Sequence, residues 1–163
     1  RSLSYRQDIL FLFIGSGACW QTALNFKREH ALANIEVYPL QAEDCVPYTM
    51  TLATLSLVAL DEGAEELMVP SKVFYYLAAG SAVIGICQNE NELKDIIEGA
   101  NCGICVNPKR APQLAREIVN LIDDKNRLNI YRKNARIAAV STYSREVGLS
   151  RFISIFSKLG WIE

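Results

Sequence analysis

The stretch Val69-Pro-Ser-Lys-Val-Phe-Tyr-Tyr-Leu-Ala-Ala-Gly-Ser-Ala-Val-Ile-Gly-Ile-Cys87 places a helical segment directly before an apolar strand. We predict a helix over 71–79 and a strand over 82–87. The strand segment lacks the alternation of apolar and polar residues that a half-exposed strand shows, so we expect it to be covered on both faces. A helix followed by a fully buried strand is typical of α/β proteins with parallel sheets.

The same alternation of short apolar runs and helical patterns extends along the whole chain. It predicts a doubly wound, mainly parallel Rossmann-like sheet of α/β class with a C-terminal helical tail. We expect residues 1–163 to form a single domain of a longer two-domain protein. The other predicted strands are 9–14, 35–39, 55–60 and 103–106, and the other helices predicted with bounds are 18–30, 46–53, 90–98, 112–123 and 145–159.

Composition excludes several classes of function. The residues are 50% hydrophobic and the formal net charge is -1, so the chain has no electrostatic footprint for nucleic acid, and we predict no nucleic acid partner. Basic residues do recur at helical spacing, and we interpret them as one solvated helix face: Arg127, Arg132, Lys133 and Arg136. No apolar run approaches the roughly 18 residues that span a bilayer.

The five cysteines predict buried thiols of a reducing cytoplasm and no metal site. Cys102-Gly-Ile-Cys105 has the spacing of a redox or half-zinc motif, but Cys105 falls within a predicted buried strand. The only histidine, His30, is distant in sequence, and we expect it on the surface near a helix end.

Ligands of doubly wound sheets bind outside the carboxyl ends of the strands. The loops expected there are 15–17, 40–46, 61–71, 88–91 and 107–111. Gly15-Ser-Gly17 looks like a phosphate loop but lacks the third glycine of a dinucleotide fingerprint, so a tight strand–helix turn is the alternative. The acidic residues of 61–66 either meet sugar or ribose hydroxyls or are simply solvated.

The beginning of the helix at residue 71 is the candidate anion site. Pro70 fixes its entry, and we expect the Ser71 hydroxyl to cap it. A helix N-terminus offers unpaired N–H groups and partial positive charge, which suit a diphosphate. Lys72 adds a full charge where the helix dipole alone disfavours one, which is tolerable if an anion binds there. The alternative is a plain cap beside a solvated lysine.

Taken in order, these segments resemble the C-terminal domain of family 4, GT-B type retaining glycosyltransferases of the bacterial surface-polysaccharide branch. The resemblance covers almost the whole chain. It is carried by Phe13-Ile-Gly-Ser-Gly17, Asn34-Ile-Glu-Val37, Pro39-Leu-Gln41, Val69 to Gly80, Ala82-Val-Ile84, Glu92, Gly103, Val106, Pro108 and Asn134-Ala-Arg136.

Two departures from the family pattern affect the site. Two family glutamates, eight positions apart, fall on Leu67 and Tyr75 here, so the ribose-binding role of the second is not carried over. We expect Glu65 or Glu66, beside Leu67, to take that role. The family segment whose Arg and Lys neutralise the donor diphosphate, and the N-terminal domain that carries the acceptor site, match nothing in residues 1–163.

The resemblance implies the donor-binding half of a glycosyltransferase. The parent enzyme would transfer a hexose-type sugar from a nucleotide-diphosphate sugar to a lipid-linked or saccharide acceptor, with no cofactor besides the donor. The site residues that the resemblance implies are Pro70, Ser71, Lys72, Glu65, Glu66, Gly15, Gly17, Leu40 and Gln41. Leu40 and Gln41 follow a strand, at the place where the family's backbone groups read the base.

The partners implied are the nucleotide sugar, the N-terminal acceptor domain of the parent chain and, through that domain, a membrane-associated lipid-linked acceptor. The parent is expected in the cytoplasm, peripheral at the inner face of the membrane, and the isolated fragment is expected to be inactive. Two alternatives stay open: a nucleotide-sugar 2-epimerase and a non-catalytic Rossmann-like binding domain.

Overall fold

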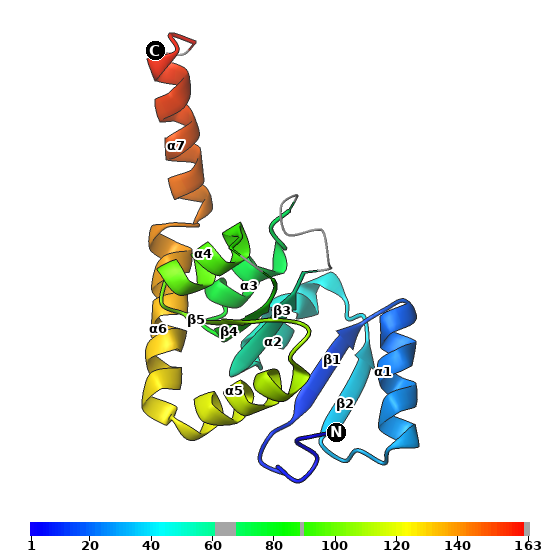
Figure 1. The fold of residues 1–163 in the computed structure, drawn as a ribbon. Coiled ribbons are helices and arrows are strands. Elements are labelled where there is room, and N and C mark those ends of the chain that lie inside the picture. Colours follow the sequence, from blue (N-terminus) through cyan, green and yellow to red (C-terminus); the bar gives the residue numbers. More distant parts are fainter. Residues whose placement is uncertain (61–67, 89, 162–163) are drawn as a thin grey trace. The chain divides into compact units, whose positions relative to one another are not determined.

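The computed structural model describes residues 1–60, 68–88 and 90–161, which form the helices and parallel strands of an α/β protein (Figure 1). The chain divides into two compact units, Arg1–Thr49 and Met50–Glu163. Each unit is described by itself. The predicted α/β class with parallel sheets is confirmed, while the single domain over 1–163 stays a prediction.

The first unit contains a two-stranded parallel sheet and one long helix. Strand β1 (Phe11–Gly15) pairs with β2 (Ile35–Pro39), and α1 (Ala18–Glu29) connects them. An ion pair of 2.9 Å joins Lys27 of α1 to Glu36 of β2, so α1 lies against the face of the sheet that carries Glu36. A short 3-10 helix, η1 (Glu43–Cys45), follows β2 and leads into α2 (Val46–Thr51).

The second unit contains a three-stranded parallel sheet. Its strands β3 (Leu55–Ala59), β4 (Ala82–Ile86) and β5 (Gly103–Val106) lie in sequence order, with β4 in the centre. Helices α3 (Lys72–Ala78) and α4 (Glu92–Gly99) precede β4 and β5. The predicted helical tail consists of α5 (Ala111–Asp123), α6 (Lys125–Ser141) and α7 (Arg145–Lys158) (Figure 1).

The core of the second unit lies around β4, which explains its uninterrupted apolar sequence. Ala82, Val83 and Ile84 are completely buried. On the neighbouring strand, Gly103 makes the closest approach: a Cβ atom added there would lie 1.7 Å from the carbonyl oxygen of Val83. Only a residue without a side chain therefore fits between β4 and Ile97 of α4.

Helices α3 and α4, which precede β4 and β5, end in the same way. Gly80 after α3 and Asn101 after α4 have φ angles of 67° and 46°, in the left-handed region. The next residues, Ser81 and Cys102, donate backbone hydrogen bonds five positions back, to Tyr76 and Ile97, which is the pattern of a Schellman motif. Gly99 is the last residue of α4 and is still helical, and Asn101 takes the left-handed conformation.

Helix α6 contacts the C-terminal end of α3 through two arginines that the sequence analysis placed on a solvated face. Arg136 Nη1 donates to the carbonyl oxygen of Ala78 at 2.7 Å, and Arg132 Nε donates to that of Gly80 at 3.2 Å. The two carbonyl oxygens lie at the end of the helix and have no intrahelical donor. The arginines therefore supply hydrogen bonds to acceptors that would otherwise be hydrated. That interpretation was therefore wrong for two of the four basic residues.

The cysteines divide into two groups. Cys87 and Cys102 are buried and Cys105 is half-buried, as expected, but Cys19 and Cys45 are exposed on α1 and η1. The two exposed cysteines fall outside the strands, where no sheet covers them. Burial raises the pKa of the Cys102 thiol to about 11.

Most predicted element boundaries differ from the observed ones by one or two residues. The first strand begins at Phe11, not at Ile9, because Ile9 donates to the carbonyl oxygen of Arg6 and belongs to the turns before β1. Helix α2 ends at Thr51, two residues early. Within the described ranges, no helix is both long enough and apolar enough to cross a membrane.

Candidate functional site

The N-terminus of α3 carries three of the predicted site residues. Ser71 and Lys72 are exposed and Pro70 is half-buried. The helix follows β3, and β3 runs parallel to β4, so α3 approaches the sheet from the side on which the carboxyl ends of the strands lie. The structure thus brings Pro70, Ser71 and Lys72 together on the side where α/β proteins bind ligands.

Ser71 does not cap the helix with its side chain, contrary to the expectation from the sequence. Its φ and ψ angles of -55° and -24° are helical, and its hydroxyl makes no capping hydrogen bond. The first turn instead begins at Pro70, whose carbonyl oxygen accepts from Val73 at 3.0 Å. A side-chain cap requires an extended residue, and Ser71 is already inside the first turn.

This geometry leaves two backbone donors available. The N–H groups of Ser71 and Lys72 have no acceptor among residues 1–60, 68–88 and 90–161, since the first bonded amide of the helix is that of Val73. The Lys72 ammonium group likewise has no acidic partner within those ranges. A cation and two N–H groups without an acceptor in the described part of the chain form an arrangement that can bind an anion.

Tyr75 shares the exposed face of α3 with Lys72. The two residues are three positions apart, which places them on one side of a helix, and Tyr75 is 58% exposed. The opposite side of the helix holds Val73 and Leu77, both fully buried. Tyr75 therefore presents an aromatic ring and a hydroxyl beside the lysine, at the position where the family pattern has a glutamate.

The glycines Gly15 and Gly17 form the turn between β1 and α1. Gly17 has a φ angle of 91° and a ψ angle of -171°, a conformation open only to glycine, and its carbonyl oxygen accepts from Trp20 at 3.2 Å. Gly17 therefore lies in a tight strand–helix turn and is the N-cap of α1, whereas a ligand role for Gly15 and Gly17 stays a prediction.

Leu40 and Gln41 lie at the same edge of the first unit as these glycines, because Gly15 is opposite Pro39 in the parallel register. The side chain of Leu40 is exposed. The Gln41 amide donates to the carbonyl oxygen of Pro39 at 2.7 Å, so part of its hydrogen-bonding capacity is used locally. The sequence-predicted residues of the first unit are therefore neighbours.

Two residues of the predicted site, Glu65 and Glu66, lie outside the described residues, and their roles stay predictions. Leu67, on which the first family glutamate falls, lies outside them too. Tyr75 is the one position of that pattern that the structure describes.

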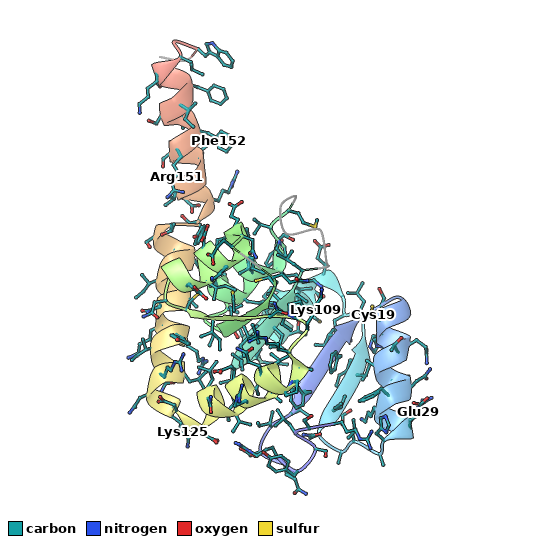
Figure 2. The ribbon with its side chains drawn as sticks, in the orientation of Figure 1. Cys19, Glu29, Lys109, Lys125, Arg151 and Phe152 are labelled. Atoms are coloured by element: carbon teal, nitrogen blue, oxygen red, sulfur yellow. The ribbon has the colours of Figure 1, made fainter. Side chains whose placement is uncertain are left out.

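The loops after β4 and β5 add residues that the sequence analysis did not single out. Asn91 caps α4, since its side-chain oxygen accepts from the Lys94 amide at 3.0 Å. After β5, Lys109 and Arg110 are exposed cations on the carboxyl side of the sheet, and Figure 2 labels Lys109 there. The sequence could have indicated these two cations, because they form a basic pair directly after the predicted strand and the dipeptide Asn107-Pro108.

Other parts of the described chain offer little to a cofactor or metal. Within the described ranges, no group of three His, Cys, Asp or Glu side chains could hold a metal ion. A cavity of about 590 Å³ lies between α3, α6 and the beginning of α7, lined by Phe74, Arg136, Tyr143 and Val147 among others. Its walls are mainly apolar, and none of the predicted site residues lines it.

Comparison with known proteins supports a relation to glycosyltransferases. No family model matches the chain. Over 151 residues, 91% of the chain, it is 25% identical to the putative colanic acid biosynthesis glycosyl transferase WcaI of Escherichia coli K12. Over 147 residues, 87% of the chain, it is 26% identical to the probable glycosyltransferase WbjE of Pseudomonas aeruginosa. The chain spans 36% and 35% of the lengths of these two relatives.

Solved structures show the same fold at lower identity. WaaG, a glycosyltransferase involved in lipopolysaccharide biosynthesis, matches 85% of this chain and 36% of its own with a TM-score of 0.67 and 17% identity. Anabaena HepE, solved in complex with UDP-glucose, matches 96% and 43% with a TM-score of 0.74 and 13% identity. Sucrose-phosphate synthase of Thermosynechococcus elongatus matches 91% and 38%, with a TM-score of 0.72 and 16% identity.

These comparisons agree with the parallel sheets and helices of the two units. The two sequence relatives and WaaG are described as glycosyltransferases, and each match extends over most of the present chain. The chain has the α/β fold of GT-B glycosyltransferases and is similar in sequence to bacterial glycosyltransferases.

Proposed function

We propose that residues 1–163 are the donor-binding half of a retaining glycosyltransferase of family 4. The nucleotide-diphosphate sugar binds along the carboxyl ends of the strands, and the enzyme transfers a hexose-type sugar to a lipid-linked or saccharide acceptor held by an N-terminal domain. The parent enzyme works in the cytoplasm, at the inner face of the membrane. The observation that carries this proposal is the exposed Lys72 beside two backbone N–H groups that have no acceptor among the residues that the structure describes.

The chemistry of glycosyl transfer explains what this position would do. An oxygen of the acceptor hydroxyl bonds to the anomeric carbon and releases its proton, the bond from that carbon to the diphosphate oxygen breaks, and the nucleoside diphosphate leaves with the electron pair. Negative charge therefore grows on the diphosphate. Fixed N–H dipoles and a lysine that need no reorganisation stabilise that charge in the transition state.

Support from the relatives is of two kinds. WcaI and WbjE carry names of glycosyltransferases, and they are similar to nine tenths of this chain. HepE was solved with UDP-glucose, which makes a uridine-diphosphate sugar the first donor to test. A screen of nucleotide-diphosphate sugars would identify the base and the sugar that the present protein uses.

The test is calorimetric titration of UDP-glucose, then of ADP-glucose and GDP-mannose, into the full-length protein and its Lys72→Ala variant. If Lys72 meets the diphosphate, the variant should lose roughly 1.5–3 kcal/mol of binding, about ten- to a hundredfold in Kd. The loss should shrink as salt is raised, because mobile ions screen an exposed charge.

Lys133→Ala is the matched control. Lys133 is an exposed lysine of α6 and has no partner in an ion pair within the described ranges. This variant should bind the donor as the unchanged protein does. Equal donor affinity in the Lys72→Ala variant and the unchanged protein would show that Lys72 does not belong to the site. If the full-length protein binds none of the nucleotide-diphosphate sugars, the donor-binding function is overturned.

A further inference from the structure

Two cysteines from neighbouring strands lie on one face of the sheet in the second unit. Cys105 of β5 is opposite Gly85 of β4, and its sulfur lies 2.7 Å from the position that a Cβ atom of Gly85 would take. Cys87 follows two residues after Gly85, and its amide donates to the carbonyl oxygen of Val106 at 3.1 Å, so the strand pairing continues to Cys87. Residues two apart in a strand share a face. The two thiols are therefore neighbours, and a hydrogen bond joins them.

The pair is not the one that the motif Cys102-Gly-Ile-Cys105 indicated. The Cys102 thiol donates to the carbonyl oxygen of Ile97 at 3.3 Å, at the end of α4. Two residues that are three positions apart in an extended segment lie about 10 Å from each other. The partner of Cys105 therefore comes from the neighbouring strand, and Cys102 is a separate buried thiol.

The geometry of Cys87 and Cys105 favours a bridging atom over a direct disulfide. Neighbouring strands are roughly 4.8 Å apart and two residues advance the chain by roughly 6.6 Å, so the two Cα atoms are about 8 Å apart. A disulfide requires Cα atoms within roughly 4.4–6.8 Å. Two sulfurs held by one thiophilic atom, at the roughly 2.3 Å of a zinc–thiolate bond, lie about 3.5–4 Å apart. Hydrogen-bonded thiols need little movement to reach that separation.

The surroundings of the two thiols favour a neutral product. Leu93 and Ile97 of α4 pack over Gly85, Cys87 is buried and Cys105 is half-buried. Burial raises the pKa of the Cys105 thiol, so this thiol keeps its proton at neutral pH. Metal ions bind thiolates and would leave negative charge among these apolar side chains. No group of three metal-ligating side chains exists among the described residues either. A ligand that reacts with protonated thiols and needs only two of them fits better.

We infer that Cys87 and Cys105 form a dithiol site for trivalent arsenicals, which bridge β4 and β5. With phenylarsine oxide, two arsenic–sulfur bonds form and the arsenic–oxygen double bond breaks. Both thiol protons leave with that oxygen as one water molecule, arsenic stays trivalent, and the product is neutral. The half-buried Cys105 is the point of entry, and the buried Cys87 forms the second bond. The inference concerns the thiols and holds whether or not the protein binds a sugar donor.

The location of the arsenic bridge has a test that needs no variant. Trypsin cleaves after Lys94, so Cys87 and Cys105 fall on different peptides, 73–94 and 95–109, whereas Cys102 and Cys105 share one. Mass spectrometry of the full-length protein, treated with phenylarsine oxide and then digested, should find these two peptides joined through one phenylarsine group. A phenylarsine group held within 95–109 alone, or no group on either peptide, would overturn the inference.

Serine variants give an independent readout. The reference is the full-length protein with Cys19→Ser and Cys45→Ser, because these two thiols are exposed and react on their own. Intact-mass spectrometry counts the phenylarsine groups bound. Cys87→Ser and Cys105→Ser should each lose one group relative to the reference, and Cys102→Ser, the matched control, should lose none. An unchanged count in Cys105→Ser, or a group lost in Cys102→Ser, would contradict the dithiol site.

Release of the arsenical distinguishes a bridge from a single bond. A dithiol such as 2,3-dimercaptopropanol closes its own ring around arsenic, so it should remove the group from the reference protein. The same concentration of thiol groups supplied as 2-mercaptoethanol should leave most of it bound. Equal release by the two reagents would show that only one protein sulfur holds the arsenic.

Discussion

Arg136 of α6 donates a hydrogen bond of 2.7 Å to the carbonyl oxygen of Ala78, in the last turn of α3. One turn earlier on α6, Arg132 donates to the carbonyl oxygen of Gly80 at 3.2 Å. Both contacts hold the C-terminal end of the helix whose N-terminus carries Lys72. The segment Asn134-Ala-Arg136, which the family resemblance singled out, therefore positions the candidate site and need not touch the donor.

Substitution of Arg136 should destabilise the second unit. Arg136→Ala removes a charged donor from a helix-terminal carbonyl that is then left to water, and we expect a loss of about 1 kcal/mol in the free energy of unfolding. Urea denaturation followed by circular dichroism measures it. Lys133→Ala, on the same helix, should change the free energy by less than about 0.5 kcal/mol. Equal effects of the two variants would contradict the proposed contact.

Gly103→Ala should be far more damaging than substitution of a helical glycine. The new Cβ would lie 1.7 Å from the Val83 carbonyl oxygen, a backbone atom that cannot move without displacing β4. We expect a loss above about 3 kcal/mol, or no soluble protein. Gly148→Ala is the control, because no heavy atom lies within 4 Å of its Cβ position and alanine favours a helix by about 1 kcal/mol. The measurement is thermal unfolding of both variants.

The absence of a side-chain cap at Ser71 has a direct test. Ser71→Ala should leave the free energy of unfolding within about 0.5 kcal/mol of the unchanged protein. Asn91 does cap its helix, with 3.0 Å between its side-chain oxygen and the Lys94 amide, so Asn91→Ala should cost about 1 kcal/mol. Chemical denaturation measures the free energy of unfolding of both variants. A cost at Ser71 equal to that at Asn91 would restore the capping role predicted from the sequence.

Stability should fall in alkaline solution. Burial raises the pKa of Cys102 from 9.0 to about 11, so between these values the unfolded chain loses a proton that the folded chain keeps. The free energy of unfolding therefore decreases as pH rises from about 9 to about 11, and this contribution is fully present below pH 9. The Cys102→Ala variant should show a shallower decrease in urea denaturation between pH 8 and pH 10.5. Identical slopes in the two proteins would show that Cys102 does not titrate differently on folding.

The sequence analysis succeeded where local pattern and tertiary environment agree. The apolar run over 82–87 predicted a strand covered on both faces, and β4 is the most buried strand of the second unit. The helix predicted over 112–123 begins with Pro112, and Pro112 lies in the first turn of α5, where its fixed φ angle fits. In both cases a single physical requirement, burial or a fixed φ angle, determines the local structure.

The predictions that failed depend on contacts between residues distant in sequence. Arg132 and Arg136 have the spacing of a solvated face, and only the end of α3, more than fifty residues away, gives them acceptors. Ser71 has the composition of a cap, but its φ and ψ angles are helical and its hydroxyl makes no capping hydrogen bond.

The last helix has a practical consequence for work on this chain. Along α7, Leu149, Phe152 and Ile153 recur at helical spacing and are exposed, and Figure 2 labels Phe152 next to Arg151 on this helix. Hydration of such an exposed apolar stripe costs free energy, and salts that strengthen hydrophobic association raise that cost. Purified residues 1–163 should therefore self-associate when ammonium sulfate is added, and they should do so at a lower ammonium sulfate concentration than the Phe152→Ser variant. Without detergent, the protein should be stored at low salt.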